Sequence, residues 1–325
     1  MLMGYWHNWK SPKAGNIPFN AIDERYDIIM VAFTMPKDTS MVMQFTPFGM
    51  QEDEFRKYIA AYQDNGKKVL LSVGGATSSL DLTTEGRKAN FINSIVTLLL
   101  KYEFDGIDIN IEHGESILNK GGTIRHPENM AQLYLIGAIR EIMSTYSDLF
   151  HRRMLLTLAP ETAYVQGGQS AYKHIWGGYL PILDALRDSI FMVQVQLYNS
   201  GTMLDLNGTV RTVGTPEFVV SMTEALLSGF QTKGGFFKGF HEQQVAITLP
   251  ACKSAAGSGF IDPTILSACI KYLTGLGKQV GTYKLKKRGG YPQIGGLTVW
   301  SINWEANENC NGLYPIAEMW RKIGL

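Results

Sequence analysis

The stretch from Phe104 to Glu112 alternates apolar and polar side chains, and this alternation predicts a buried β-strand. Successive side chains of a strand point to opposite faces, so three isoleucines line one face while Asp108, Asn110 and Glu112 line the other. The isoleucine face needs a packed layer, and the polar face needs partners or solvent, because burying an unpaired carboxylate is very costly. A parallel barrel strand that ends at an open mouth meets both conditions. An amphipathic edge strand with one solvent-exposed face is the simpler alternative. Its polar face would then place like charges close together without a functional reason.

Strand-like and helix-like segments alternate along the whole chain. Eight segments have the apolar and β-branched content of strands: residues 2–9, 26–34, 68–75, 104–112, 154–161, 189–199, 244–251 and 295–304. Helical apolar spacing predicts helices at residues 52–65, 89–102, 127–143, 216–230, 263–276 and 314–323. Eight strands separated by helices favour a closed (β/α)8 TIM barrel over an open doubly wound sheet. We therefore expect an α/β protein with a single domain over residues 1–325.

The charges of the chain are nearly balanced, with 30 Lys and Arg against 29 Asp and Glu. Such a chain has no electrostatic field strong enough to favour nucleic acid or an anionic membrane, so we expect neither as a partner. We expect a neutral substrate instead. No apolar run reaches the ~18 to 20 residues that span a membrane. The first predicted strand begins almost at Met1, which predicts no signal peptide; the residues leave open whether the protein is cytoplasmic or a leader has been removed.

The cysteines and histidines show no metal-ligand pattern. Cys252, Cys269 and Cys310 are an odd number without C-x-x-C spacing, which argues against both a zinc site and a disulfide scaffold. We therefore expect the three thiols to be free or buried. The six histidines lack a spacing such as H-E-x-x-H, so the sequence predicts no metal, and we expect no cofactor. We also expect a monomer.

The acid-bearing strand resembles the D-G-x-D-x-D-x-E signature of family 18 glycoside hydrolases, the chitinases and their relatives, with Asn110 replacing the third acid. Other strand ends are similar to those of compact bacterial members: Ser72-Val73-Gly74-Gly75, Ala159-Pro160-Glu161, Gln196-Leu197-Tyr198-Asn199 and Trp300. Each falls at the carboxyl end of a predicted strand, where barrel enzymes assemble their active sites. The segment between the last two strands is too short for the α+β insertion that many members carry, so the resemblance is to the insertion-free type.

The resemblance implies an endo-acting enzyme that cleaves β-1,4 linkages between N-acetylglucosamine units in chitin or chito-oligosaccharides, in an extracellular location. Glu112 would be the general acid, with its pKa raised by burial and by the charge of Asp108. The acetamido oxygen of the substrate would replace the usual second carboxylate as nucleophile. Tyr198 would donate to that oxygen, and Asn110 would hold the acetamido group without supplying a charge. Slower turnover and more transglycosylation would follow.

Ten further residues are implied in substrate binding: Tyr5, Trp6, Phe33, Ser72, Gly74, Gly75, Glu161, Gln196, Asn199 and Trp300. Tyr5 and Ser72 would hydrogen-bond Asp108, and Trp300 would form an apolar floor. Two alternatives stay open. One is a chitin-binding lectin derived from a chitinase, which Asn110 favours although such lectins usually lose the acid that Glu112 keeps. The other is an endo-β-N-acetylglucosaminidase that acts on N-glycan cores by the same mechanism.

Overall fold

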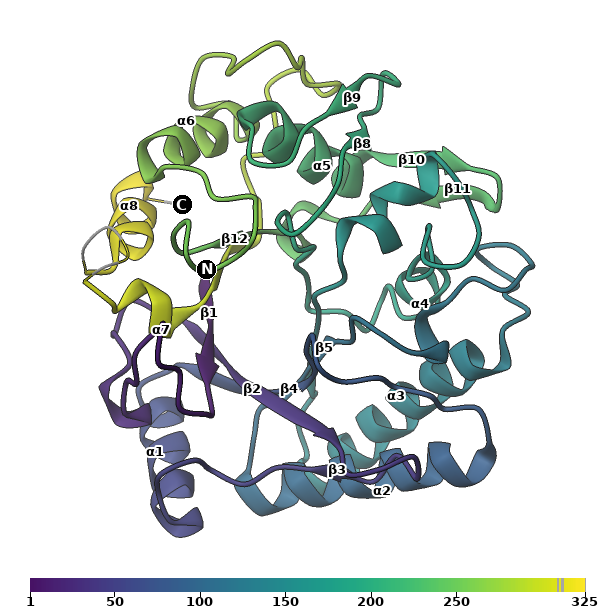
Figure 1. Cartoon of the computed structure of the whole chain (residues 1–325), viewed down its shortest axis with the longest axis vertical. Coiled ribbons are helices and arrows are strands. Elements are labelled where there is room, and N and C mark those ends of the chain that lie inside the picture. The colour runs from purple at the N-terminus through teal and green to yellow at the C-terminus, as the bar shows by residue number, and fades with distance from the viewer. Residues whose placement is uncertain (309, 311–312, 325) are drawn as a thin grey trace.

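A computed structural model describes residues 1–308, 310 and 313–324, and its centre is a barrel of parallel strands ringed by helices (Figure 1). The barrel strands are β1 (Leu2–His7), β2 (Ile28–Pro36), β4 (Lys68–Gly74), β5 (Gly106–Asn110), β6 (Leu155–Leu158), β7 (Met192–Val193), β12 (Ala246–Pro250) and β13 (Gly296–Trp300). They pair in the order β12-β13-β1-β2-β4-β5-β6-β7. Parallel bridges from Val193 to Val245 and from Gln196 to Thr248 join the two ends of this order. The expected TIM barrel is confirmed.

Helices cover the outside of the barrel, and the small strands β3 and β8 to β11 lie towards the periphery in this view (Figure 1). The helices are α1 (Glu52–Asp64), α2 (Glu85–Tyr102), α3 (Met130–Phe150), α4 (Leu180–Ala185), α5 (Pro216–Ser228), α6 (Pro263–Leu273), α7 (Ile302–Glu305) and α8 (Pro315–Ile323). β3 (Met43–Gln44) pairs antiparallel with the end of β2. Two hairpins pair β8 (Met203–Leu204) with β9 (Val210–Arg211) and β10 (Gly229–Thr232) with β11 (Gly235–Lys238). Residues 251–295 hold α6 and connecting loops, without an inserted sheet.

The alternation of β5 separates two apolar layers. Ile107, Ile109 and Ile111 belong to the large cluster packed between the barrel and its helices. A smaller cluster fills the barrel interior with Met3, Tyr5, Ile28, Met30, Ala32, Leu70, Ala159, Met192 and Ala246. Asp108 and Asn110 are buried on the interior side, where Asp108 contacts Tyr5. The face that each β5 side chain occupies is therefore the one that the pattern predicts.

Several predicted boundaries are wrong, and local capping explains them. The last strand ends at Trp300 rather than at residue 304, because the Ser301 hydroxyl accepts from the Trp304 N–H at 3.3 Å and starts α7. Thr84 caps α2, which starts at Glu85, four residues before its predicted start. Asn129 caps α3, which then runs seven residues past its predicted end. Caps satisfy the first free N–H groups of a helix, so they outweigh the apolar spacing in fixing its start.

The expectation of three free or buried thiols is wrong for two of them. Cys252 and Cys310 form a disulfide across 58 residues of sequence, whereas Cys269 is free and buried. Cys252 follows β12 and Cys310 follows the α7 segment after β13, and these two strands are paired neighbours. The pairing depends on that adjacency, which cysteine spacing alone does not reveal. Within the described ranges, no helix is long and apolar enough to cross a membrane.

Candidate active site

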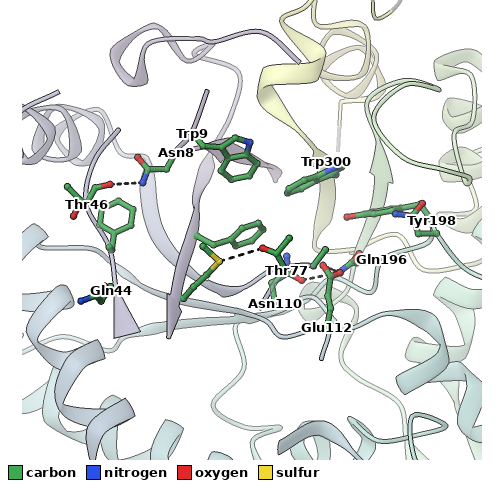
Figure 2. A pocket seen from close by; sticks show the side chains of 15 residues that line it. Asn8, Trp9, Gln44, Thr46, Thr77, Asn110, Glu112, Gln196, Tyr198 and Trp300 are labelled. Carbon is green, nitrogen blue, oxygen red and sulfur yellow. Dashed lines mark hydrogen bonds between the residues drawn. The ribbon is translucent and has the colours of Figure 1, made fainter. Parts of the chain in front are cut away.

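A cleft of about 660 Å³ opens at the carboxyl ends of the barrel strands (Figure 2). Its lining comes from strand ends and the loops after them: Asn8, Trp9, Phe33, Met35, Gln44, Phe45, Thr46, Ala76, Thr77, Asn110, Glu112, Gln196, Tyr198, Asn199 and Trp300. Figure 2 shows Glu112, Asn110 and Gln196 close together, with Trp300 and Tyr198 beside them and Gln44 and Thr46 at the far end. This position is the one where barrel enzymes bind their substrates.

Asp108 lies below the cleft, fully buried and held by four side chains. The hydroxyls of Tyr5 and Ser72 donate to Oδ2 at 2.9 and 2.6 Å. Thr157 and Gln194 donate to Oδ1 at 2.6 and 2.8 Å. Burial raises the pKa of Asp108, and the four hydrogen bonds oppose that rise by favouring the charged form. A carboxylate held in this way organises the barrel interior and does not face the cleft.

Gln196 connects Asn110 and Glu112. Its Nε2 donates to the Asn110 Oδ1 at 2.9 Å, the Glu112 Oε1 at 3.3 Å and the Ala159 carbonyl at 3.1 Å. A carbonyl only accepts, and so does an ionised carboxylate, so these contacts require the nitrogen of Gln196 on this side. The Asn110 oxygen therefore faces Gln196, and the NH₂ group of Asn110 is left for another acceptor. Asn110, which replaces the third acid of the motif, is thus held in one amide orientation.

Two carboxyl groups near the cleft have raised pKa values. Burial raises the pKa of Glu112, while the Gln196 hydrogen bond and the His113 charge oppose the rise. Of the two expected causes, burial acts on Glu112 and the Asp108 charge does not contribute. Burial, followed by the Glu112 charge, raises the pKa of Glu161 to about 7. Both groups hold a proton at a higher pH than an exposed carboxyl does, which is what a general acid requires.

The predicted site residues divide into those that face the cleft and those that support it. Phe33, Asn110, Glu112, Gln196, Tyr198, Asn199 and Trp300 line the cleft. Gly74 and Gly75 are buried with φ of 116° and 86°, a conformation that favours glycine. A Cβ on Gly74 would lie 2.3 Å from the Asn110 carbonyl oxygen, so the end of β4 packs directly on the acid-bearing strand.

Besides the supporting residues, Trp6 and Glu161 also lie outside the cleft lining. Trp6 is buried in the outer core, where its ring meets Phe19 edge-on at 4.9 Å and its indole N–H donates to the Ile17 carbonyl at 3.0 Å. Glu161 forms a bridge with the backbone of Gln196 and does not line the cleft. In the part of the chain that the structure describes, no cluster of three His, Cys, Asp or Glu is arranged to hold a metal.

The far end of the cleft comes from residues that the sequence did not single out as site residues. Asn8 joins two loops there, because its Nδ2 donates to the Thr46 carbonyl at 2.8 Å and its Oδ1 accepts from the Phe48 N–H at 2.7 Å. No motif marks these loops. Gln194 was also missed, although it lies two residues before Gln196, and the period of a strand could have placed both on the interior face.

Replacing Gln196 by Met is expected to raise the pKa of Glu112, because the change removes a hydrogen bond that favours the ionised carboxylate. The proton then stays on Glu112 to a higher pH. Carbon-13 NMR titration of the labelled Glu112 carboxyl, compared between the parent and the variant, measures this shift. A Glu112 pKa that falls or stays in place would contradict the role given to Gln196.

Comparisons with known proteins agree with this geometry. Residues 1–213 match the model of the glycosyl hydrolases family 18. The chain is 39% identical over 313 residues to Chitinase Chi52 of Paenibacillus xylanexedens, covering 95% of this chain and 59% of that protein. It is 35% identical over 314 residues to a probable class II chitinase of Arthroderma benhamiae, covering 90% and 92%. The chain therefore spans about three fifths of the length of Chi52 and nearly all of the Arthroderma protein.

Solved structures show the same relationship. A family GH18 chitinase from Chromobacterium violaceum superposes with a TM-score of 0.86 at 33% identity, covering 98% of this chain and 83% of that one. A putative Chitinase A from Streptomyces coelicolor gives 0.79 at 28% identity, covering 99% and 98%. The barrel, the acid-bearing strand and these similarities lead to one conclusion. The chain belongs to glycosyl hydrolase family 18.

Proposed function

We propose that the protein hydrolyses β-1,4 linkages between N-acetylglucosamine units of chitin or chito-oligosaccharides from within the chain, by a substrate-assisted retaining mechanism. One observation carries the proposal: among the described residues that line the cleft, Glu112 alone has a carboxyl group. An acid without a second carboxylate suits a reaction in which the substrate supplies the nucleophile. The names of the similar chitinases support the choice of sugar.

The rest of the cleft is suited to that reaction. A retaining glycosidase usually places a second carboxylate about 5 to 5.5 Å from the acid, but Asp108 is buried and already accepts four hydrogen bonds. The acetamido oxygen of the bound sugar takes that role. Burial raises the pKa of Tyr198 well above its usual value, so its hydroxyl stays protonated and donates to the acetamido group. Trp300 offers an apolar surface to the ring of the same sugar.

Incubation with chitotetraose and chitohexaose, followed by mass spectrometry, tests the activity and its internal mode. At early times, endo cleavage of chitohexaose gives trisaccharide as well as disaccharide and tetrasaccharide, whereas disaccharide and tetrasaccharide alone would overturn the internal mode. A protein that binds these oligosaccharides and leaves them intact would be a lectin instead. An N-glycan core glycopeptide, assayed in parallel, distinguishes the endo-β-N-acetylglucosaminidase alternative.

The products of hydrolysis are expected to retain the β configuration at the anomeric carbon. Attack by the acetamido oxygen inverts that carbon once, and attack by water inverts it again. Proton NMR of the products within the first minutes, before mutarotation, measures the ratio of anomers. An early excess of the α anomer would rule out the double displacement.

We also propose that the protein works outside the cell as a monomer. The Cys252–Cys310 disulfide supports an oxidising location, because such bonds persist mainly in secreted proteins. Immunodetection in the culture medium and sedimentation analysis test the two statements, and a protein confined to the cytosol would overturn the first.

A further inference from the structure

The acid-bearing strand ends before its last acid. β5 stops at Asn110, and Glu112 lies beyond that end. The Asn110 carbonyl still accepts from the main chain of the neighbouring strand, through the Gly75 N–H at 2.7 Å. The carbonyls of Ile111 and Glu112 come next. Backbone carbonyls in a protein interior are nearly always hydrogen-bonded, so the partners of these two decide how the backbone at the acid is held.

Two tyrosine hydroxyls bind these carbonyls. Tyr179 donates to the Ile111 carbonyl at 2.7 Å, and Tyr164 donates to the Glu112 carbonyl at 3.0 Å. Both side chains are buried. Burial raises the pKa of Tyr164 to about 12 and the pKa of Tyr179 well above its usual value, so both hydroxyls keep the proton that they donate. Neither side chain lines the cleft, so neither is placed to touch a substrate.

These hydrogen bonds hold the peptide units on both sides of the Glu112 Cα. A peptide unit is planar, so only φ and ψ set the angle between one unit and the next. The Ile111 carbonyl belongs to the unit before Glu112, and the Glu112 carbonyl belongs to the unit after it. Holding both planes therefore holds φ and ψ of Glu112 and the direction of its Cα–Cβ bond. Gln196 holds the far end of the side chain, because its Nε2 donates to Oε1 at 3.3 Å.

The two tyrosines are fixed to each other and to their surroundings. The Tyr179 N–H donates to the Tyr164 carbonyl at 3.0 Å, and the two rings meet edge-on with centroids 5.9 Å apart. Gln132 of α3 donates to the Gly178 carbonyl at 2.6 Å. A Cβ on Gly178 would lie 2.1 Å from the Ile117 carbonyl oxygen, so this segment packs directly on the loop after β5. Both hydroxyls therefore come from a support that is tied to α3 and to that loop.

We infer that Tyr164 and Tyr179 are positioning residues that keep the carboxyl group of Glu112 aimed at the glycosidic oxygen. The inference rests on the proposed function, in which Glu112 is the general acid. Without one of the hydroxyls, a peptide unit beside Glu112 can rotate, and its carboxyl group spends less time where it can protonate the leaving oxygen. A displacement of about 1 Å can cost about 10² in rate. The loss of one hydrogen bond should shift the balance of positions about three- to tenfold.

The kcat/KM values of Tyr164→Phe and Tyr179→Phe on two substrates test the inference. Phenylalanine keeps each ring and removes only the hydroxyl. On chitotetraose, whose leaving sugar needs a proton, each variant should lose about three- to tenfold, and the double variant should lose more. On a dinitrophenyl glycoside of chitobiose, the leaving group departs without a proton. All variants should then match the parent, because kcat/KM reports only the steps up to the first irreversible one.

Tyr146→Phe is the matched control. The Tyr146 hydroxyl donates to the Phe104 carbonyl at 3.0 Å, which is the same kind of hydrogen bond at the opposite end of β5, and its ring is also buried. This variant should lower the temperature of thermal unfolding about as much as the other two, since it leaves a similar carbonyl without its partner. It should keep the parent kcat/KM on both substrates.

Either tyrosine variant is decisive if the other does not fold. A folded Tyr164→Phe or Tyr179→Phe with the parent kcat/KM on chitotetraose would overturn the inference for that residue and leave the proposed function intact. An equal loss on both substrates would also overturn it, because general damage to the cleft does not depend on the leaving group. So would an equal loss from Tyr146→Phe. A parent protein that does not cleave chitotetraose would overturn the proposed function itself.

Discussion

Glu112→Gln should reduce the hydrolysis of chitotetraose by about 10² to 10⁴, the usual contribution of general acid catalysis. The amide keeps the shape of the side chain but has no proton of suitable acidity for the leaving oxygen. Oligosaccharide binding should change little, because Trp300, Tyr198 and the rest of the cleft stay in place. Steady-state rates and calorimetric binding of chitotetraose, measured on the same preparations, separate the two effects.

Glu161 provides the most demanding comparison for that experiment. The pKa of its carboxyl is raised to about 7, so on protonation alone it is also suited to act as an acid. Geometry favours Glu112, which lines the cleft, whereas Glu161 does not. Glu161→Gln should therefore cost much less than Glu112→Gln, and Glu128→Gln, at an exposed position, should cost nothing measurable. If Glu161→Gln were inactive and Glu112→Gln retained the parent rate, the assignment of the acid would be reversed.

The features that sequence predicted are those that depend on local alternation. The period of two along β5 places Asp108 inside the barrel and Ile107 outside it, and the same rule puts Gln196 and Tyr198 on the cleft side. The eight-fold recurrence of strand and helix then predicts the barrel, because parallel strands need crossover helices. These inferences need no knowledge of which distant segments meet.

The features that sequence missed depend on distant segments meeting. The disulfide joins Cys252 to Cys310 because β12 and β13 are neighbours. The hydrogen bond from Asn8 to the Thr46 carbonyl joins two loops at the far wall of the cleft, and no sequence motif marks these loops. Both outcomes require the barrel order before they can be derived. The end of α5 is different, because it depends on a local glycine: the helix stops at Gly229, whose φ is 75°, and the hairpin of β10 and β11 follows.

Asn110→Asp should raise the hydrolysis rate by about 10², comparable to restoring one preorganised electrostatic contact in an active site. In the proposed mechanism a positive oxazolinium intermediate forms next to residue 110, and a carboxylate would stabilise it where a neutral amide does not. Gln196 already donates to the Oδ1 of residue 110 at 2.9 Å, which would help to keep the new carboxylate ionised. The site is therefore arranged to accept the charge without rebuilding.

The same substitution should also change what the intermediate reacts with. In the proposed mechanism Glu112 takes a proton from water in the second step, and a neighbouring negative charge strengthens it as a base. With Asn110, water should be activated less well. A sugar hydroxyl bound in the acceptor part of the cleft should then compete better, and products longer than the starting oligosaccharide should accumulate. Asn110→Asp should lower the yield of those products as the hydrolysis rate rises, and mass spectrometry of a chitotetraose time course measures both. If the variant were no faster and its long products as abundant, the amide held by Gln196 would itself be the competent group, and charge at residue 110 would not limit this reaction.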